Sequence, residues 1–113
     1  MKWAVAAVLA LWSGAGAADC RQALALGLDV SGSVDAREYR LQLDGLAGAL
    51  SSGEVREVLL DPAQPPVWLA VYEWSGGSEQ RLILDWTAIA DEAALVAVAG
   101  RLASTRRILT DTK

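Results

Sequence analysis

The sequence predicts an α/β fold built on an open, largely parallel sheet. The first observation is an apolar stretch of strand length, Ala23 to Asp29, which ends abruptly at an aspartate. The second is that a helical pattern begins a few residues after this strand, as in the opening unit of an open α/β sheet. The third is the order of the patterns that follow, which is helix, strand, hairpin strand and helix.

The first predicted strand is followed by oxygen-bearing side chains. Ala23 to Asp29 is continuously apolar, which is typical of a strand buried on both faces of a parallel sheet. Asp29, Ser31 and Ser33 then lie at the carboxyl end of the strand, where open α/β sheets bind ligands. Their hard oxygen atoms suit Mg²⁺, Ca²⁺ or Mn²⁺. We therefore predict a divalent-cation site here, with a helix-capping turn as the alternative.

The first helix is predicted to begin at Asp35. Asp35 or Ser33 is its expected N-cap, and Glu38 stands three residues after Asp35, as in a capping box. The residues 51–53 (Ser-Ser-Gly) break the helix, and Glu54 to Leu60 is expected to form a short turn. The predicted buried face of this helix consists of Tyr39, Leu43, Leu46, Ala47 and Leu50.

Two antiparallel strands and a second long helix are predicted next. The strands are Val67 to Trp74 and Glu79 to Trp86, joined by a Ser-Gly-Gly-Ser hairpin. Strict alternation would place Arg81, Ile83 and Asp85 on one face of the second strand and Leu82, Leu84 and Trp86 on the other. Trp68, Trp74 and Trp86 are interpreted as core or strand-pairing residues. Asp91 is the expected cap of the helix, whose buried face is Leu95, Val98, Ala99 and Leu102.

Composition excludes several functions. A chain of 113 residues with a net charge of −4 is one small domain at most, and its charge disfavours nucleic acid or an anionic membrane as partner. Histidine is absent, which excludes a Ser-His-Asp triad and the histidine zinc motifs. The only lysines, Lys2 and Lys113, stand at the chain ends, which disfavours a Ser-Lys dyad and leaves Ser31 with no general base except carboxylates. We therefore predict no enzyme activity. A Mg²⁺-dependent hydrolase using Asp29 is the alternative, although Ser31 stands where such phosphatases have a second aspartate.

The first 18 residues are typical of a secretory signal peptide. Lys2 precedes an apolar run from Trp3 to Trp12, and small residues follow up to Ala18. Cleavage is expected after an Ala-x-Ala pattern or just before Asp19, and the run is too short for a transmembrane span. We expect an exported protein, periplasmic or secreted, without a stable membrane anchor after cleavage. Cys20 is then a lone cysteine, either a reactive thiol or one whose partner lies elsewhere.

The motif Asp29-x-Ser31-x-Ser33 resembles the metal-ion-dependent adhesion site of von Willebrand factor type A domains. The resemblance implies that the two serine hydroxyls bind the metal directly and that the aspartate acts through water. It also implies that a carboxylate from a protein partner fills the open coordination position. Three stretches, residues 28–39, 71–76 and 84–87, are similar to a bacterial secreted subgroup, domain of unknown function 1194.

The resemblance covers the first half of such a domain. We expect residues 19–113 to be the N-terminal half of a von Willebrand A-type domain, from a truncated product or a partial sequence. In the whole domain a threonine and a second aspartate complete the site; Thr110 or Thr112 is the candidate threonine, and the second aspartate has no candidate. Relatives carry a cysteine near that aspartate, which is a possible partner of Cys20. Without the neighbouring strand of the family sheet, Ala23 to Asp29 becomes an exposed edge.

These patterns predict a non-catalytic, exported binding module that presents a divalent cation to an acidic group of a protein partner. The alternative is a truncated or vestigial fragment without a functional metal site.

Overall fold

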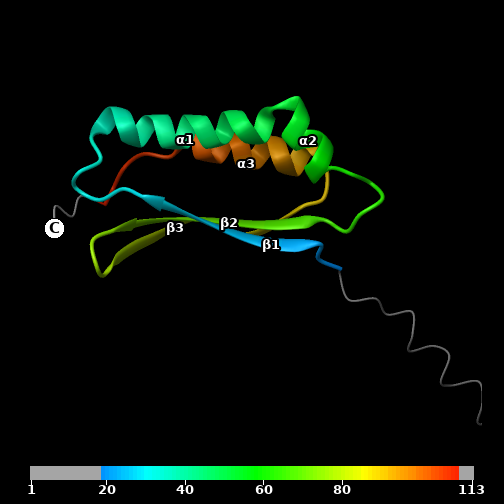
Figure 1. Ribbon diagram of the computed structural model, residues 1–113, viewed down its shortest axis with the longest axis horizontal. Helices are drawn as coiled ribbons and strands as arrows, with labels where there is room; N and C mark the ends of the chain where they lie inside the picture. The colour runs from blue at the N-terminus through cyan, green and yellow to red at the C-terminus, as the bar shows by residue number, and fades with distance from the viewer. Residues whose placement is uncertain (1–18, 110–113) are drawn as a thin grey trace, which may run out of the picture.

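The computed structural model describes residues 19–109 and has two layers (Figure 1). A three-stranded sheet forms one layer, and the helices lie together on one face of it. This arrangement confirms the predicted mixed α/β class. The elements in chain order are β1 (Gln22–Asp29), α1 (Ala36–Ser51), α2 (Gly53–Leu59), β2 (Val67–Ser75), β3 (Glu79–Ile89) and α3 (Glu92–Ser104). The predicted signal peptide, residues 1–18, lies outside the described residues.

The sheet has the strand order β1-β2-β3. β1 is parallel to β2, with Asp29 opposite Trp74, and β2 is antiparallel to β3. The hairpin between β2 and β3 turns at Gly76, whose φ of 64° is accessible to glycine at little cost. Among residues 19–109, β1 therefore has one unpaired edge.

The prediction that β1 is buried on both faces is wrong. Its leucines at 24, 26 and 28 are partly buried, whereas Ala23, Ala25 and Gly27 are exposed. The reason is the position of the helices, which pack against only one face of the sheet (Figure 1). β1 consequently alternates in burial, although its sequence is apolar throughout.

The predicted alternation of β3 is also wrong near its middle. Ile83 and Leu84 are both buried, whereas Asp85 and Trp86 are both exposed. The pairing of β2 with β3 has two register shifts, on either side of Val71. Each shift adds one residue to β3. Leu84, which lies between the two shifts, therefore faces the core, and from Thr87 to Ile89 the alternation is again the predicted one. The strand also continues to Ile89, beyond its predicted end.

The predicted helices are confirmed, together with their caps. The Asp35 side chain accepts a hydrogen bond from the backbone N–H of Glu38, and the Glu38 carboxylate accepts one from the N–H of Asp35, both at 2.8 Å. This is the reciprocal capping box. Asp91 caps α3 by accepting from the N–H of Ala94 at 2.8 Å. The predicted short turn after α1 is the seven-residue helix α2. No helix within residues 19–109 has the length and apolar character needed to cross a membrane.

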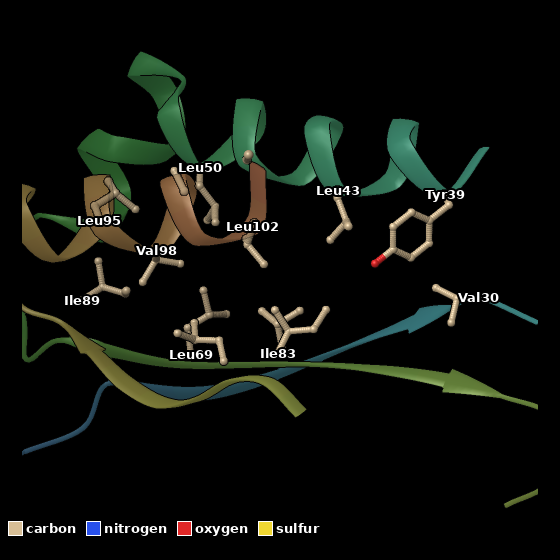
Figure 2. Packing of buried hydrophobic residues seen from close by; sticks show 14 residues of the cluster. Val30, Tyr39, Leu43, Leu50, Leu69, Ile83, Ile89, Leu95, Val98 and Leu102 are labelled. Carbon is tan, nitrogen blue, oxygen red and sulfur yellow. The ribbon is translucent and has the colours of Figure 1, made fainter. Parts of the chain in front are cut away.

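The core lies between the helices and the sheet (Figure 2). Leu43 from α1, Leu102 from α3 and Val71 from β2 are completely buried in it. The predicted buried faces of both helices are correct, with Leu46 only partly buried. The interpretation of the tryptophans as core or strand-pairing residues holds for Trp68 and Trp74, which pair with Ala88 and Gln80 across the sheet. None of the three belongs to the buried core, and Trp74 and Trp86 are 37% and 47% exposed.

Candidate metal centre

The loop after β1 is held at the carboxyl end of the strand by its own backbone. The Val30 N–H donates to the Trp74 carbonyl at 2.9 Å, which extends the pairing one residue past β1. The Val34 N–H donates to the Ser31 carbonyl at 2.9 Å, which closes a turn before α1 begins. Gln42 of α1 reaches back and donates to the Asp29 carbonyl at 2.8 Å. Asp29, Ser31 and Ser33 therefore lie at the carboxyl end of β1, and whether they form a metal site stays a prediction.

The structure brings the three predicted ligand residues together. Ser31 donates to Asp29 Oδ1 twice, from its backbone N–H at 2.9 Å and from its hydroxyl at 2.6 Å. The Ser31 and Ser33 hydroxyl oxygens lie 3.4 Å apart. The hydrogen bonds from the Ser31 hydroxyl and backbone lower the pKa of Asp29 below its ordinary value of 3.8. Asp29 is therefore ionised at neutral pH.

This oxygen arrangement fits a hard cation. Mg²⁺ lies about 2.1 Å from each ligand oxygen, so neighbouring ligands of its octahedron are about 3.0 Å apart. The Ser31 and Ser33 hydroxyl oxygens, 3.4 Å apart, are close to that value, whereas the 2.6 Å between the Ser31 hydroxyl and Asp29 Oδ1 is the length of their hydrogen bond. Within residues 19–109, no group of three or more acidic, histidine or cysteine side chains could hold a metal. Asp29 alone would supply negative charge to a cation held by this loop, with two neutral hydroxyls beside it.

Arg107 contacts the same loop from a distant part of the sequence. Its guanidinium donates to the carbonyls of Val34 at 2.6 Å, Val30 at 2.8 Å and Ser31 at 3.1 Å. These bonds use backbone oxygens and leave the side-chain oxygens of the predicted ligands available. The sequence shows Arg107 only as half of its one basic pair, and no local pattern connects it with the loop 76 residues earlier.

A buried carboxylate lies behind this arginine. Tyr39 packs its ring under the Arg107 guanidinium, 5.5 Å from ring centroid to carbon, and points its hydroxyl into the core (Figure 2). That hydroxyl donates to Oε1 of Glu73 at 2.5 Å, and Nη1 of Arg81 lies 3.8 Å from Oε2. Burial, and then the Glu73 hydrogen bond, raise the pKa of Tyr39 above its ordinary value.

Sequence reasoning noted the stretch around Glu73 but assigned it no role. The signal was available, because Glu73 occupies an inward position of an otherwise apolar strand and such a charge needs a partner. Tyr39 and Arg81 provide that partner, so contacts run from β3 through the core to the loop after β1.

Two predicted residues stay outside this description. Thr110 and Thr112, the candidate metal-site threonines, follow the last described residue, Leu109. The Leu109 carbonyl accepts from Nε of Arg107 at 3.2 Å, so the chain beside the loop is described up to that point. Cys20 is exposed and forms no disulfide among the residues that the structure describes.

Fold and loop together define a mixed α/β protein with an oxygen-rich loop at the carboxyl end of its first strand. The chain belongs to the family described as Protein of unknown function (DUF1194), whose model matches residues 19–112. This match confirms the similarity to that subgroup, whereas the von Willebrand A-type relationship stays a prediction. Searches of curated proteins and of solved structures gave no match.

Proposed function

We propose that this chain is a non-catalytic, metal-dependent binding module of von Willebrand A-like type. In this proposal, Asp29, Ser31 and Ser33 hold Mg²⁺, or Ca²⁺ or Mn²⁺, and present it to a carboxylate of a protein partner. The observation that carries the proposal is the spacing of the three side-chain oxygens at the carboxyl end of β1, at 2.6 Å and 3.4 Å. Asp29 also has a lowered pKa, which keeps its carboxylate charged.

The charge balance of the loop favours recognition of an acidic group. Two hydroxyls and one carboxylate leave a divalent cation with net positive charge, so a partner carboxylate is attracted to it. Mg²⁺ retains water ligands that such a carboxylate can replace. The Arg107 guanidinium adds a further positive charge beside the loop, which strengthens this attraction but opposes the cation itself.

Three features support the proposal of a non-catalytic, exported module of von Willebrand A-like type. The three-stranded sheet has an unpaired edge at β1 within residues 19–109, where an A-type domain continues with further parallel strands. The absence of histidine from the sequence argues against acid–base catalysis. A Mg²⁺-dependent hydrolase would instead be detected by covalent trapping of Asp29 with a phosphate mimic. The signal-peptide pattern of residues 1–18 supports export to the periplasm or beyond.

A second candidate is favoured by the contacts of Arg107. Its guanidinium bonds three carbonyls of the loop, so the loop has a cation to organise it without any metal. In this alternative the motif is vestigial, and the chain is a structural fragment. The two candidates differ in what happens when Arg107 is replaced.

Calorimetric titration with Mg²⁺ and Mn²⁺ tests the proposal. Ser33→Ala removes a ligand whose side chain supports no described capping bond, and it is expected to weaken binding at least about tenfold. Ser78→Ala, in the exposed β2–β3 turn, is the matched control and should bind as the parent protein does. Arg107→Gln should strengthen metal binding, because it removes a nearby positive charge.

The vestigial alternative predicts a different pattern. Neither the parent protein nor Arg107→Gln would bind the metals, and Arg107→Gln would only lower the stability of the loop. Circular dichroism of each variant shows whether the fold is retained. A parent protein that is folded and binds neither metal contradicts the proposed function.

A further inference from the structure

We propose that a groove beside β3 binds an acidic, extended peptide segment. The groove has a volume of about 380 Å³ and lies between β3 and the chain that follows α3. We call it the arginine groove, because Arg81, Arg101 and Arg106 line it. It lies apart from the oxygens of the candidate metal centre, none of whose three ligand residues lines it.

The charge of the groove is unusual for this protein. The chain has a net charge of −4, yet the residues lining the arginine groove include three arginines and no aspartate or glutamate. A concave surface of one sign concentrates ligands of the opposite sign. The groove therefore favours carboxylates over neutral or basic ligands.

Two of the three arginines have no ion-pair partner among residues 19–109. Arg81 lies 3.8 Å from the buried carboxylate of Glu73 and donates to the Arg106 carbonyl at 2.8 Å. Arg101 uses Nε to bond the Ile83 carbonyl at 2.6 Å, which fixes its guanidinium against β3 and leaves its terminal nitrogens available. Within residues 19–109 neither Arg101 nor Arg106 forms an ion pair, and Arg106 has no side-chain hydrogen bond. Arg101 and Arg106 can therefore bond a carboxylate in the paired geometry that guanidinium favours.

The remaining lining residues favour a peptide over other acidic ligands. Leu82 and Ile108, which are 56% and 66% exposed, provide apolar contacts beside the arginines. β3 is the edge strand of the sheet among the described residues, so an extended chain can lie along it. A nucleic acid would have a larger footprint, over which the net charge of −4 repels it. An extended peptide with alternating acidic and apolar side chains matches all of these features.

Fluorescence anisotropy with a short labelled peptide of alternating glutamate and valine tests this proposal. The measurement is made on the intact chain, at low salt and with excess EDTA, so that no metal site contributes. Binding by the parent protein is expected, and it should weaken as salt is added. The matched peptide of alternating lysine and valine is expected not to bind.

Substitution of Arg106 gives the sharper test, because its side chain supports no described contact. Arg106→Gln should weaken peptide binding about tenfold, the effect of one charge-assisted hydrogen bond. Arg106→Lys should retain part of the affinity. Arg37→Gln, which removes an exposed arginine of α1 outside the groove, is the matched control and should bind as the parent does.

Four outcomes would overturn the proposal. They are no binding by the parent protein with or without EDTA, equal losses for Arg106→Gln and Arg37→Gln, binding that is seen only when EDTA is omitted, and stronger binding of a single-stranded oligonucleotide than of the acidic peptide. Loss with EDTA would assign the acidic partner to the metal loop instead. The experiment therefore distinguishes failure of the groove proposal from failure of the proposed metal site.

Discussion

The two faces of the sheet both carry large apolar side chains, but these side chains differ in burial. On the face that α1 and α3 cover, Val71 is fully buried and Ile89 is 1% exposed. On the opposite face, Trp74, Leu82 and Trp86 are between 37% and 56% exposed. The difference lies in the helices, which all pack on one side of the sheet (Figure 1). Apolar character in a strand therefore indicates that it can be buried, while the packing of other elements decides whether it is.

Two leucines test this difference most strongly. Leu43 is completely buried between α1 and the sheet, whereas Leu82 of β3 is 56% exposed. Leu43→Ala should lower the free energy of unfolding by about 2–5 kcal/mol, because it removes core contacts and leaves a cavity. Leu82→Ala should change it by less than about 0.5 kcal/mol. Urea denaturation measures both, and equal losses would mean that the open face is covered in solution.

Substitution of two tyrosines compares a hydroxyl on the covered face of the sheet with one on the open face. The Tyr39 hydroxyl donates to buried Glu73, whereas the Tyr72 hydroxyl has no hydrogen bond within residues 19–109. Tyr39→Phe should lower the free energy of unfolding by about 1–3 kcal/mol, because the Glu73 carboxylate loses a partner in the core. Tyr72→Phe should have an effect within about 0.5 kcal/mol. Thermal and urea unfolding measure both changes. An unchanged stability of Tyr39→Phe would contradict the proposal that the hydrogen bond between Tyr39 and Glu73 stabilises the fold.

Two glycines sharpen the comparison further. A Cβ at Gly27 of β1 would lie 2.6 Å from the Tyr72 ring, whereas one at Gly48 of α1 would meet no atom within 4 Å. Gly27→Ala should therefore destabilise the protein by about 1 kcal/mol, as Tyr72 is displaced. Gly48→Ala should stabilise it by up to about 1 kcal/mol through helix propensity. Combining Gly27→Ala with Tyr72→Ala should recover part of the loss, and an additive result would locate the strain elsewhere.

The smallest expected effect is the pH dependence of the loop after β1. The pKa of Asp29 is lower in the folded protein than its ordinary value, so its stabilising contribution is complete above about pH 4. That contribution is lost as the pH falls below this value and through the lowered pKa. The stability difference between the parent protein and Asp29→Asn should therefore shrink on acidification. A difference that stays constant down to pH 2 would contradict the role of the Ser31 hydrogen bonds.

Local patterns predicted most of the fold. Asp35 with Glu38, and Asp91 before α3, marked the helix starts because a cap depends on residues within one turn. The buried faces of both long helices followed from their spacing. The two register shifts in β3 could not be predicted, since they arise where β3 pairs with β2 and leave no pattern of their own.

The candidate site was predicted only in part, for a similar reason. Asp29, Ser31 and Ser33 are close in the sequence, and their position after a strand indicated their proximity in space. Arg107 reaches the same loop after α3 has returned the chain across the molecule, and only the tertiary fold brings it there. Glu73 could have been interpreted as a buried charge, but its partners Tyr39 and Arg81 come from two other elements.

The parallel pairing of β1 with β2 has a consequence for the order of folding. β2 and β3 form a hairpin of neighbouring segments, whereas β1 is separated in the sequence from its partner β2 by α1 and α2. Contacts between distant segments form late and open readily when one side is unpaired. Amide protons of β1 should therefore exchange with solvent faster than those shared by β2 and β3. The loop that carries Asp29 would then be among the last parts of the molecule to become ordered.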